Sequence, residues 1–260
     1  MAVSAIHTPL LLCTMALLLT GLVSPSTAGL SLDTVRDFLT REEDTIVFSL
    51  IERAKYPLNR PAYDPLHFGA GIGAEPGRRL NASFAELFIR ESEAVQSKDL
   101  YPAAALVNVN DAIWSMYFNE LLPLLAKNGD DGNYAVTADA DLTCLQVLSR
   151  RINYGRYVAE VKFRGDQKTY TSLIQAKDRD ALMKLLTSEA QEDVVKRRVE
   201  KKAVVFGQSI TLDEPIQTDV NNSSQANFKV DPSVVYKLYD QWVIPLTKQV
   251  EVEYLLHRLN

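Results

Sequence analysis

Two basic side chains lie eleven residues apart in a stretch that is predicted to form one helix. At about 100° per residue, Arg151 and Lys162 are separated by three turns plus roughly 20°, so both project from the same side. Gly155 and Val158 fall between them and leave an apolar gap with little side-chain volume. A cation at each end of such a gap suits a small dianion lying along the helix. The same spacing also fits cations that pair with buried carboxylates or that extend past a core to water, and the spacing alone leaves these alternatives open.

Polar side chains elsewhere in the chain are candidates to complete such a site. Thr247 and Glu251 are four residues apart, as are Ser188 and Glu192, and residues at this spacing lie one above the other on a helix face. Arg36 is near the start of the first predicted helix, where a long cation reaches over a neighbouring pocket. Each also has an ordinary structural explanation: a solvated charge for either glutamate, a helix cap for Ser188, a half-buried spacer for Thr247, and a surface ion pair for Arg36.

The segments that carry these residues have the apolar periodicity of helices. Asp33 is expected to cap the first helix, and residues 188–191 have the form of a capping box. Asp231 and Pro232 are expected to start the last helix, within which Pro245 predicts a kink. The predicted helices cover residues 32–54, 83–98, 110–125, 137–163, 169–176, 178–186 and 189–206 and the segment after Pro232.

The segments between the helices are rich in turn-forming residues, and no strand pattern or internal repeat is convincing. Residues 55–80 and 207–231 are therefore predicted to be loops. With 260 residues, of which 47% are hydrophobic, the chain can bury one sizeable core. We therefore expect an all-α fold, a single-domain helical bundle.

Composition excludes several classes of function. The formal net charge of −5, with no basic cluster among aromatic residues, argues against a nucleic-acid or anionic-membrane partner. Cys13 and Cys144 are the only cysteines, and Cys13 lies in the leader described next. The mature chain should then have one thiol and no internal disulfide.

The first residues have the pattern of a secretory signal peptide. An apolar run at 10–23 is followed by small residues, and cleavage after Ala28 would fit, although no Lys or Arg precedes the run. The run is shorter than the roughly 20 residues of a membrane span. We therefore expect a signal peptide at 1–28, a catalytic domain at 29–260, secretion with the cytosol as the alternative, and no membrane association of the mature form. Asn81, Asn221 and Asn222 are glycosylation acceptors if the chain is secreted.

Three segments resemble one known family, in the right order along the chain. They are 41–53 (REEDTIVFSLIER), 148–162 (LSRRINYGRYVAEVK) and 242–258 (WVIPLTKQVEVEYLLHR). These segments identify the chain as similar to the eukaryotic, all-helical chorismate mutases, especially the plant members. The similarity covers residues 32–98 and 101–259.

The resemblance implies a homodimeric isomerase of aromatic amino acid biosynthesis that converts chorismate to prephenate without a cofactor. The reaction is a concerted rearrangement that needs no nucleophile. The protein must hold the chair-like conformer of a flexible dicarboxylate and stabilise negative charge on the breaking ether oxygen.

By position, the resemblance also implies a role for each candidate residue. Arg36 and Arg151 would contact the two carboxylates, since Arg grips a carboxylate with two parallel hydrogen bonds. Lys162 and Glu251 would donate hydrogen bonds to the ether oxygen, and Glu192 would orient the ring hydroxyl. The same matching gives Thr247 a supporting polar role. Ser188 replaces an Asn of fungal relatives, and the matching leaves it without a clear role.

Two departures from the family pattern concern regulation. About thirty residues that relatives carry between the second and third helices, including an Arg pair, are missing where 97–102 bridges the gap. Ala135 and Val136 replace a Gly-Ser pair that serves the same effector site. We therefore expect an enzyme that is not allosterically regulated. The rival hypothesis is a secreted, non-catalytic binding protein that keeps the fold.

The leader can be tested directly. Residues 1–29 fused to a reporter should send it into the secretory path and be removed, because the apolar run is recognised there. Secretion and the size of the mature reporter are measured, with a reporter lacking the segment as control. An uncleaved reporter in the cytosol would contradict the localisation.

Overall fold

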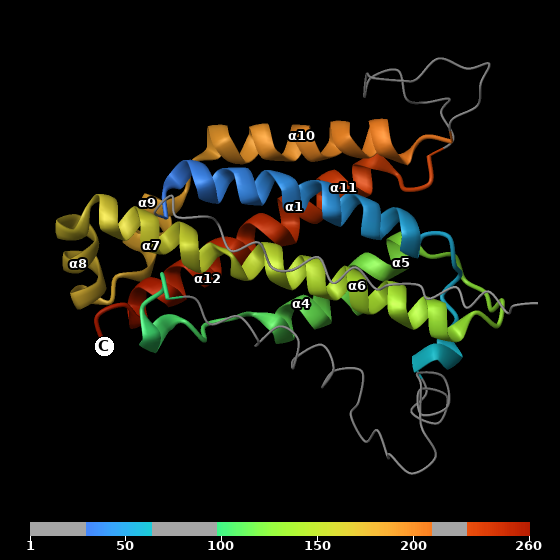
Figure 1. Cartoon of the computed structure of the whole chain (residues 1–260), viewed down its shortest axis with the longest axis horizontal. Coiled ribbons are helices and arrows are strands. Elements are labelled where there is room, and N and C mark those ends of the chain that lie inside the picture. The colour runs from blue at the N-terminus through green and yellow to red at the C-terminus, as the bar shows by residue number, and fades with distance from the viewer. Residues whose placement is uncertain (1–29, 64–97, 210–227) are drawn as a thin grey trace, which may run out of the picture.

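The protein is a bundle of helices that run along its long axis (Figure 1). The structure, a computed structural model, describes residues 30–63, 98–209 and 228–260. The long helices there are α1 (Leu32–Arg53), α6 (Tyr134–Asn153), α10 (Glu189–Gly207) and α12 (Ile244–His257). Within these ranges the extended structure is an isolated bridge between Gln208 and Phe228, so the all-α prediction is confirmed.

Helix α1 begins one residue after its cap, Ser31. The Ser31 hydroxyl accepts a hydrogen bond from the Thr34 amide at 3.2 Å, and the Thr34 side chain completes a capping box. The prediction of Asp33 as the cap is wrong: it lies in the first turn, where a carboxylate faces the positive end of the helix dipole.

The predicted central helix is present as two helices joined almost without interruption. Helix α6 ends at Asn153 and α7 (Gly155–Gly165) follows, with Tyr154 between them at φ −64° and ψ −12°. The Tyr154 ring stacks on Phe38 of α1, with ring centroids 3.9 Å apart. The junction is thus held against the bundle, and α7 continues the direction of α6 (Figure 1).

Two prolines follow π-helical turns. Helix α4 (Asn110–Met116), a π turn (Tyr117–Leu121) and α5 (Leu122–Leu125) form the predicted third helix, and Pro123 is the second residue of α5. In the last helix, α11 (Pro232–Leu238), a π turn (Tyr239–Val243) and α12 follow each other, and Pro245 has the same place in α12. Proline cannot donate to the carbonyl four residues earlier, and a wider turn absorbs this defect.

Short helices gather at one end of the bundle, near the C-terminus (Figure 1). They are α8 (Gln167–Ala176) and α9 (Arg179–Leu186). Elsewhere in the described residues, 3₁₀ turns are formed by Arg60–Tyr63 and Pro102–Ala104. Ser188 is the residue before α10, but its hydroxyl makes no capping hydrogen bond, so the predicted capping box is wrong. Asp231 does cap α11, as predicted, by accepting from the Ser233 amide at 2.9 Å.

Some predictions fall outside the described residues. These are the leader with Cys13, nearly all of the predicted helix at 83–98, the three glycosylation sites, and most of the two predicted loops. Cys144 is described, and it is buried as a free thiol.

Buried polar contacts anchor α6 to α1. Arg53 and Asp141 are fully buried and paired, and the Tyr117 and Tyr63 hydroxyls donate to the same carboxylate at 2.6 and 2.7 Å. Breaking a buried pair of this kind typically costs about 3–5 kcal/mol, so these contacts define one register between the helices. The register determines where the last turn of α6, with Arg151, meets the rest of the bundle.

Candidate active site

Helix α12 packs against α7 at a point where no side chain separates them. A Cβ built on Gly155 would lie 2.8 Å from the Thr247 carbonyl oxygen, 3.1 Å from its Cγ2 and 3.3 Å from Cγ of Glu251. Contacts under 3.0 Å are not tolerated, so only glycine allows this approach. The approach brings the side of α6–α7 that carries Arg151 and Lys162 onto the side of α12 that carries Thr247 and Glu251.

Arg151 is buried, and one of its hydrogen-bond donors has no partner in the described residues. Its side chain is 5% exposed, and Nη1 donates to Oγ1 of Thr247 at 3.3 Å. The Thr247 hydroxyl in turn donates to the Val243 carbonyl at 2.6 Å, which orients its lone pairs toward the guanidinium. Within the described part of the chain, Nε of Arg151 has no hydrogen-bond partner. A buried donor without a partner is costly, so this atom favours an incoming anion.

Lys162 joins α12 to the end of α9. Its ammonium donates to the Leu186 carbonyl at 3.0 Å and to Oε2 of Glu251 at 3.3 Å. Burial raises the pKa of Glu251 above its ordinary value, and the nearby charges of Lys162, Arg151 and Lys248 lower it by less. Glu251 therefore stays protonated to a higher pH than a free glutamate, and a protonated carboxyl can donate a hydrogen bond.

Glu192 and Ser188 lie at the start of α10, beside this pair. The ammonium of Lys248 approaches the Glu192 carboxylate at 3.0 Å, with both side chains only partly exposed. The Ser188 residue is exposed and makes no cap, so the structure gives it no partner within the site.

Arg36 is the candidate that the structure does not bring into contact with the others. Its side chain is 48% exposed, and the ion pair described for it is with Asp33, 3.6 Å away on the same helix. The ordinary explanation, a surface ion pair, describes it in this conformation.

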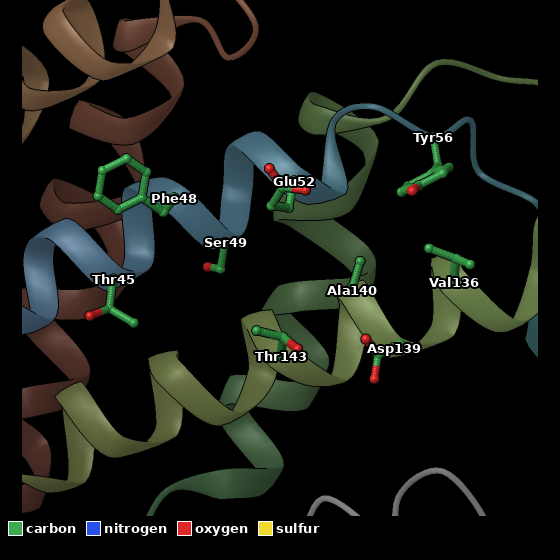
Figure 2. Close-up of a pocket in the computed structure, with 9 residues that line it drawn as sticks. All are labelled: Thr45, Phe48, Ser49, Glu52, Tyr56, Val136, Asp139, Ala140 and Thr143. Atoms are coloured by element: carbon green, nitrogen blue, oxygen red, sulfur yellow. The ribbon is translucent and has the colours of Figure 1, made fainter. Parts of the chain in front are cut away.

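A separate pocket of about 440 Å³ lies between α1 and the N-terminal half of α6 (Figure 2). Thr143 is the last residue of α6 that lines this pocket, and along the helix axis it lies roughly 12 Å before Arg151. The pocket combines exposed apolar side chains with the carboxylates of Glu52 and Asp139. The residues around it are Thr45, Phe48, Ser49, Glu52, Tyr56, Val136, Asp139, Ala140 and Thr143.

The site that includes Arg151 has the parts for stabilising negative charge. It offers cationic donors and a protonatable carboxyl on facing helices. In the ranges that the structure covers, no cluster of His, Cys, Asp and Glu is suited to a metal ion, and no helix is long and apolar enough to cross a bilayer. Sequence reasoning missed Lys248, although it adjoins Thr247 and precedes Glu251 by three residues.

Such a cluster of buried cationic donors on an all-helical bundle suits a small anion, and comparison with known proteins identifies the class of protein. The family model described as "Chorismate mutase type II" matches residues 133–252 of this chain. The cytosolic chorismate mutase 2 of Zea mays is 49% identical, over 89% of this chain and 97% of its own.

Solved structures agree with this. The crystal structure of AtCM1 with phenylalanine in its allosteric site has 38% identity and a TM-score of 0.70, over 90% of this chain and 99% of the other. The chorismate mutase of Candida albicans in complex with L-Trp has 30% identity and a TM-score of 0.71, over 88% and 92%. The chain belongs to the chorismate mutase family, of the all-helical eukaryotic type. It is an enzyme, and the hypothesis of a non-catalytic binding protein is set aside.

These relatives correct the expectation about regulation. The prediction of an enzyme that is not allosterically regulated is wrong, because similar solved structures carry an allosteric site or an aromatic amino acid. The prediction relied on the roughly thirty missing residues, with their Arg pair, and on Ala135 and Val136, which differ from the family pattern. Replacing such side chains does not remove a cavity, and Val136, at one of those positions, lines the pocket of Figure 2.

The comparisons also bear on the expected location of the enzyme. The name of the maize relative places that protein in the cytosol, which agrees with the alternative expectation for this chain. Nothing in the comparisons supports secretion.

The fit at Gly155 predicts the effect of a single methyl group. Gly155→Ala should push α7 away from α12 and lower kcat/KM by about 100-fold, since small misplacements of reacting groups have effects of this size. The accompanying loss in unfolding free energy should be about 1–3 kcal/mol. Prephenate formation and thermal unfolding measure the two effects.

Gly165→Ala is the matched control on the same helix. A Cβ there would meet nothing within 4 Å, so activity should be unchanged. A Gly155→Ala enzyme as active as the Gly165→Ala enzyme would contradict the close approach of the helices.

Proposed function

We propose that the site formed by α6–α7 and α12 converts chorismate to prephenate by a concerted rearrangement. The observation that carries the proposal is Arg151, a buried guanidinium with an unpartnered Nε. It lies on the same side of the α6–α7 pair as Lys162, and both face α12. A dianion held between them would satisfy the unpartnered donor and align with both cations.

Arg151 binds one substrate carboxylate in this proposal. Its fork of donors matches a carboxylate, and Thr247 supports it from behind. Arg36 binds the other carboxylate. For this, its side chain must leave Asp33, an exchange that costs little because exposed ion pairs are worth about 0–1 kcal/mol.

Lys162 and Glu251 stabilise the transition state by donating hydrogen bonds to the ether oxygen as negative charge develops there. The proposal is supported by the distance between the Lys162 ammonium and Oε2 of Glu251, 3.3 Å, at which both groups can reach one oxygen atom. An ionised Glu251 would repel the developing charge, and its raised pKa keeps the helpful, protonated form available.

The remaining parts of the proposal rest on the sequence resemblance. Glu192 orients the ring hydroxyl, and Ser188 borders it at the start of α10. No cofactor takes part. The homodimer, the catalytic domain at 29–260, and secretion through the leader at 1–28 stay predictions, the last of them tested by the reporter fusion.

The role of Glu251 predicts a pH dependence. Its folded-state pKa is raised, so the active protonated form is lost as pH rises through that value, and kcat/KM should fall roughly tenfold per pH unit above it. Glu251→Gln supplies an amide donor at every pH. It should keep activity and remove this fall, as a profile of rate against pH will show.

Glu253→Gln is the control for this experiment. Glu253 is on the same helix, paired with Arg179 at the surface, and its loss should leave the profile unchanged. If Glu251→Gln were inactive at every pH, the carboxylate would have another purpose and the ether-oxygen role would be withdrawn.

We also infer that an aromatic amino acid regulates the enzyme through the pocket of Figure 2. The inference is supported by the phenylalanine and tryptophan of the solved relatives and by the pocket's chemistry. Phe48, Tyr56 and Val136 present apolar surface to a ring, and Asp139 presents a carboxylate to an ammonium group. The Glu52 carboxylate also lines the pocket and is paired with Lys55.

At millimolar concentration, phenylalanine, tyrosine or tryptophan should change the rate severalfold. Asp139→Asn should weaken that response and leave the basal rate unchanged, because Asp139 is remote from Arg151. Asp193→Asn, which removes a carboxylate paired with Arg197 on α10, should leave the response intact. A rate unaffected by all three amino acids would overturn regulation.

A further inference from the structure

The corner between α9 and α10 is attached to the rest of the site by two lysines. Lys162 of α7 holds the corner through the Leu186 carbonyl at 3.0 Å. Lys248 of α12 holds it through Thr187, whose Oγ1 is 3.5 Å from the ammonium, and through Glu192. The corner carries Glu192, so its placement decides whether that carboxylate reaches the pocket.

Lys248 has the geometry of a two-point clamp on Glu192. Its Nζ is 3.0 Å from Oε1 and 3.2 Å from Oε2 of the same carboxylate. The Lys248 side chain is 20% exposed and that of Glu192 24%, so water screens the pair less than it screens an ordinary surface pair. Thr187 is itself fixed, because its hydroxyl donates to the Met183 carbonyl at 2.8 Å. The ammonium thus lies between the anchored Thr187 hydroxyl and the Glu192 carboxylate.

We propose that Lys248 is a positioning residue for catalysis, which fixes the Glu192 carboxylate at the edge of the pocket. The inference rests on the proposed function of Glu192 as the group that orients the substrate hydroxyl. Without the clamp, a glutamate in the first turn of α10 has several rotamers open to solvent. The clamp selects one of them before substrate binds, and this preorganisation is what a positioning residue contributes.

The position of Lys248 also gives it an electrostatic effect on the other carboxyl of the site. The charged and titratable groups that face Glu251 are Lys162 from α7, Arg151 from α6, Tyr170 from α8 and Lys248 from its own helix. The positive charge of Lys248 lowers the pKa of Glu251. Removing that charge should therefore raise this pKa and move the fall in rate to higher pH.

The test is a double-mutant cycle on the full chain, with prephenate formation followed across pH. Lys248→Met should lower kcat/KM about tenfold, the equivalent of 1.4 kcal/mol, and Lys248→Arg should recover most of it. If Lys248 acts through Glu192, adding Lys248→Met to Glu192→Gln should cause little further loss. Arg179→Met is the control, since it removes a surface pair with Glu253 on the same helix.

A purely structural role for Lys248 is distinguished by two readouts. The Tm of thermal unfolding should differ little between Lys248→Met and Arg179→Met. Only Lys248→Met should shift the pH at which the rate falls. Lys248→Gln is a second neutral variant that should reproduce both the loss and the shift.

The outcomes separate this inference from the proposed function. If the two single losses multiply in the double variant, Lys248 acts independently of Glu192 and the clamp is overturned. If Lys248→Met is fully active while Glu192→Gln is impaired, the clamp is overturned and the role of Glu192 stands. If Glu192→Gln is fully active, the proposed role of Glu192 fails, and the clamp fails with it.

Discussion

The close approach of α7 and α12 at Gly155 is the constraint on which the site depends. The helices meet with the glycine against the Thr247 carbonyl and the stem of Glu251, where a methyl group has no room. This contact sets the distance between the side of α6–α7 that carries the cations and the side of α12 that faces it. Arg151 meets Thr247 and Lys162 meets Glu251 as consequences of that one spacing. The rest of the bundle holds the spacing, with the Arg53–Asp141 pair fixing α6 on α1.

Charge balance explains why such a site suits a dianion. Arg151, Lys162 and Lys248 face the carboxyls of Glu251 and Glu192. Burial raises the pKa of Glu251, and a protonated Glu251 adds no negative charge to offset the three cations. The excess of positive charge in a partly buried pocket matches the two carboxylates of the proposed substrate. Burial, and not the neighbouring cations, explains why Glu251 is suited to donate a hydrogen bond, because burial favours the protonated carboxyl and the cations oppose it.

The correction about regulation and the exposed position of Arg36 have a common physical basis. Both concern features that depend on cavities and side-chain conformations rather than on residue identity. Val136 departs from the family pattern, yet it lines a pocket between α1 and α6 (Figure 2). Arg36 matches the family pattern, yet its ion pair is with Asp33 on its own helix.

The sequence by itself determined most of the described helices and which of the candidate side chains share a side of a helix. Periodicity placed Arg151 and Lys162 on one side of a helix and Thr247 with Glu251 on another, because helix geometry is local and repeats every 3.6 residues. Capping was predicted less well: Ser31 caps the helix that was assigned to Asp33, and Ser188 stands at the cap position without a capping hydrogen bond. Only the tertiary structure decided the direction of the Glu251 pKa shift, the partner of Lys248 and the fit around Gly155. These depend on which residues from distant parts of the chain are brought together and on how much water they exclude, and neither is encoded in spacing along the chain.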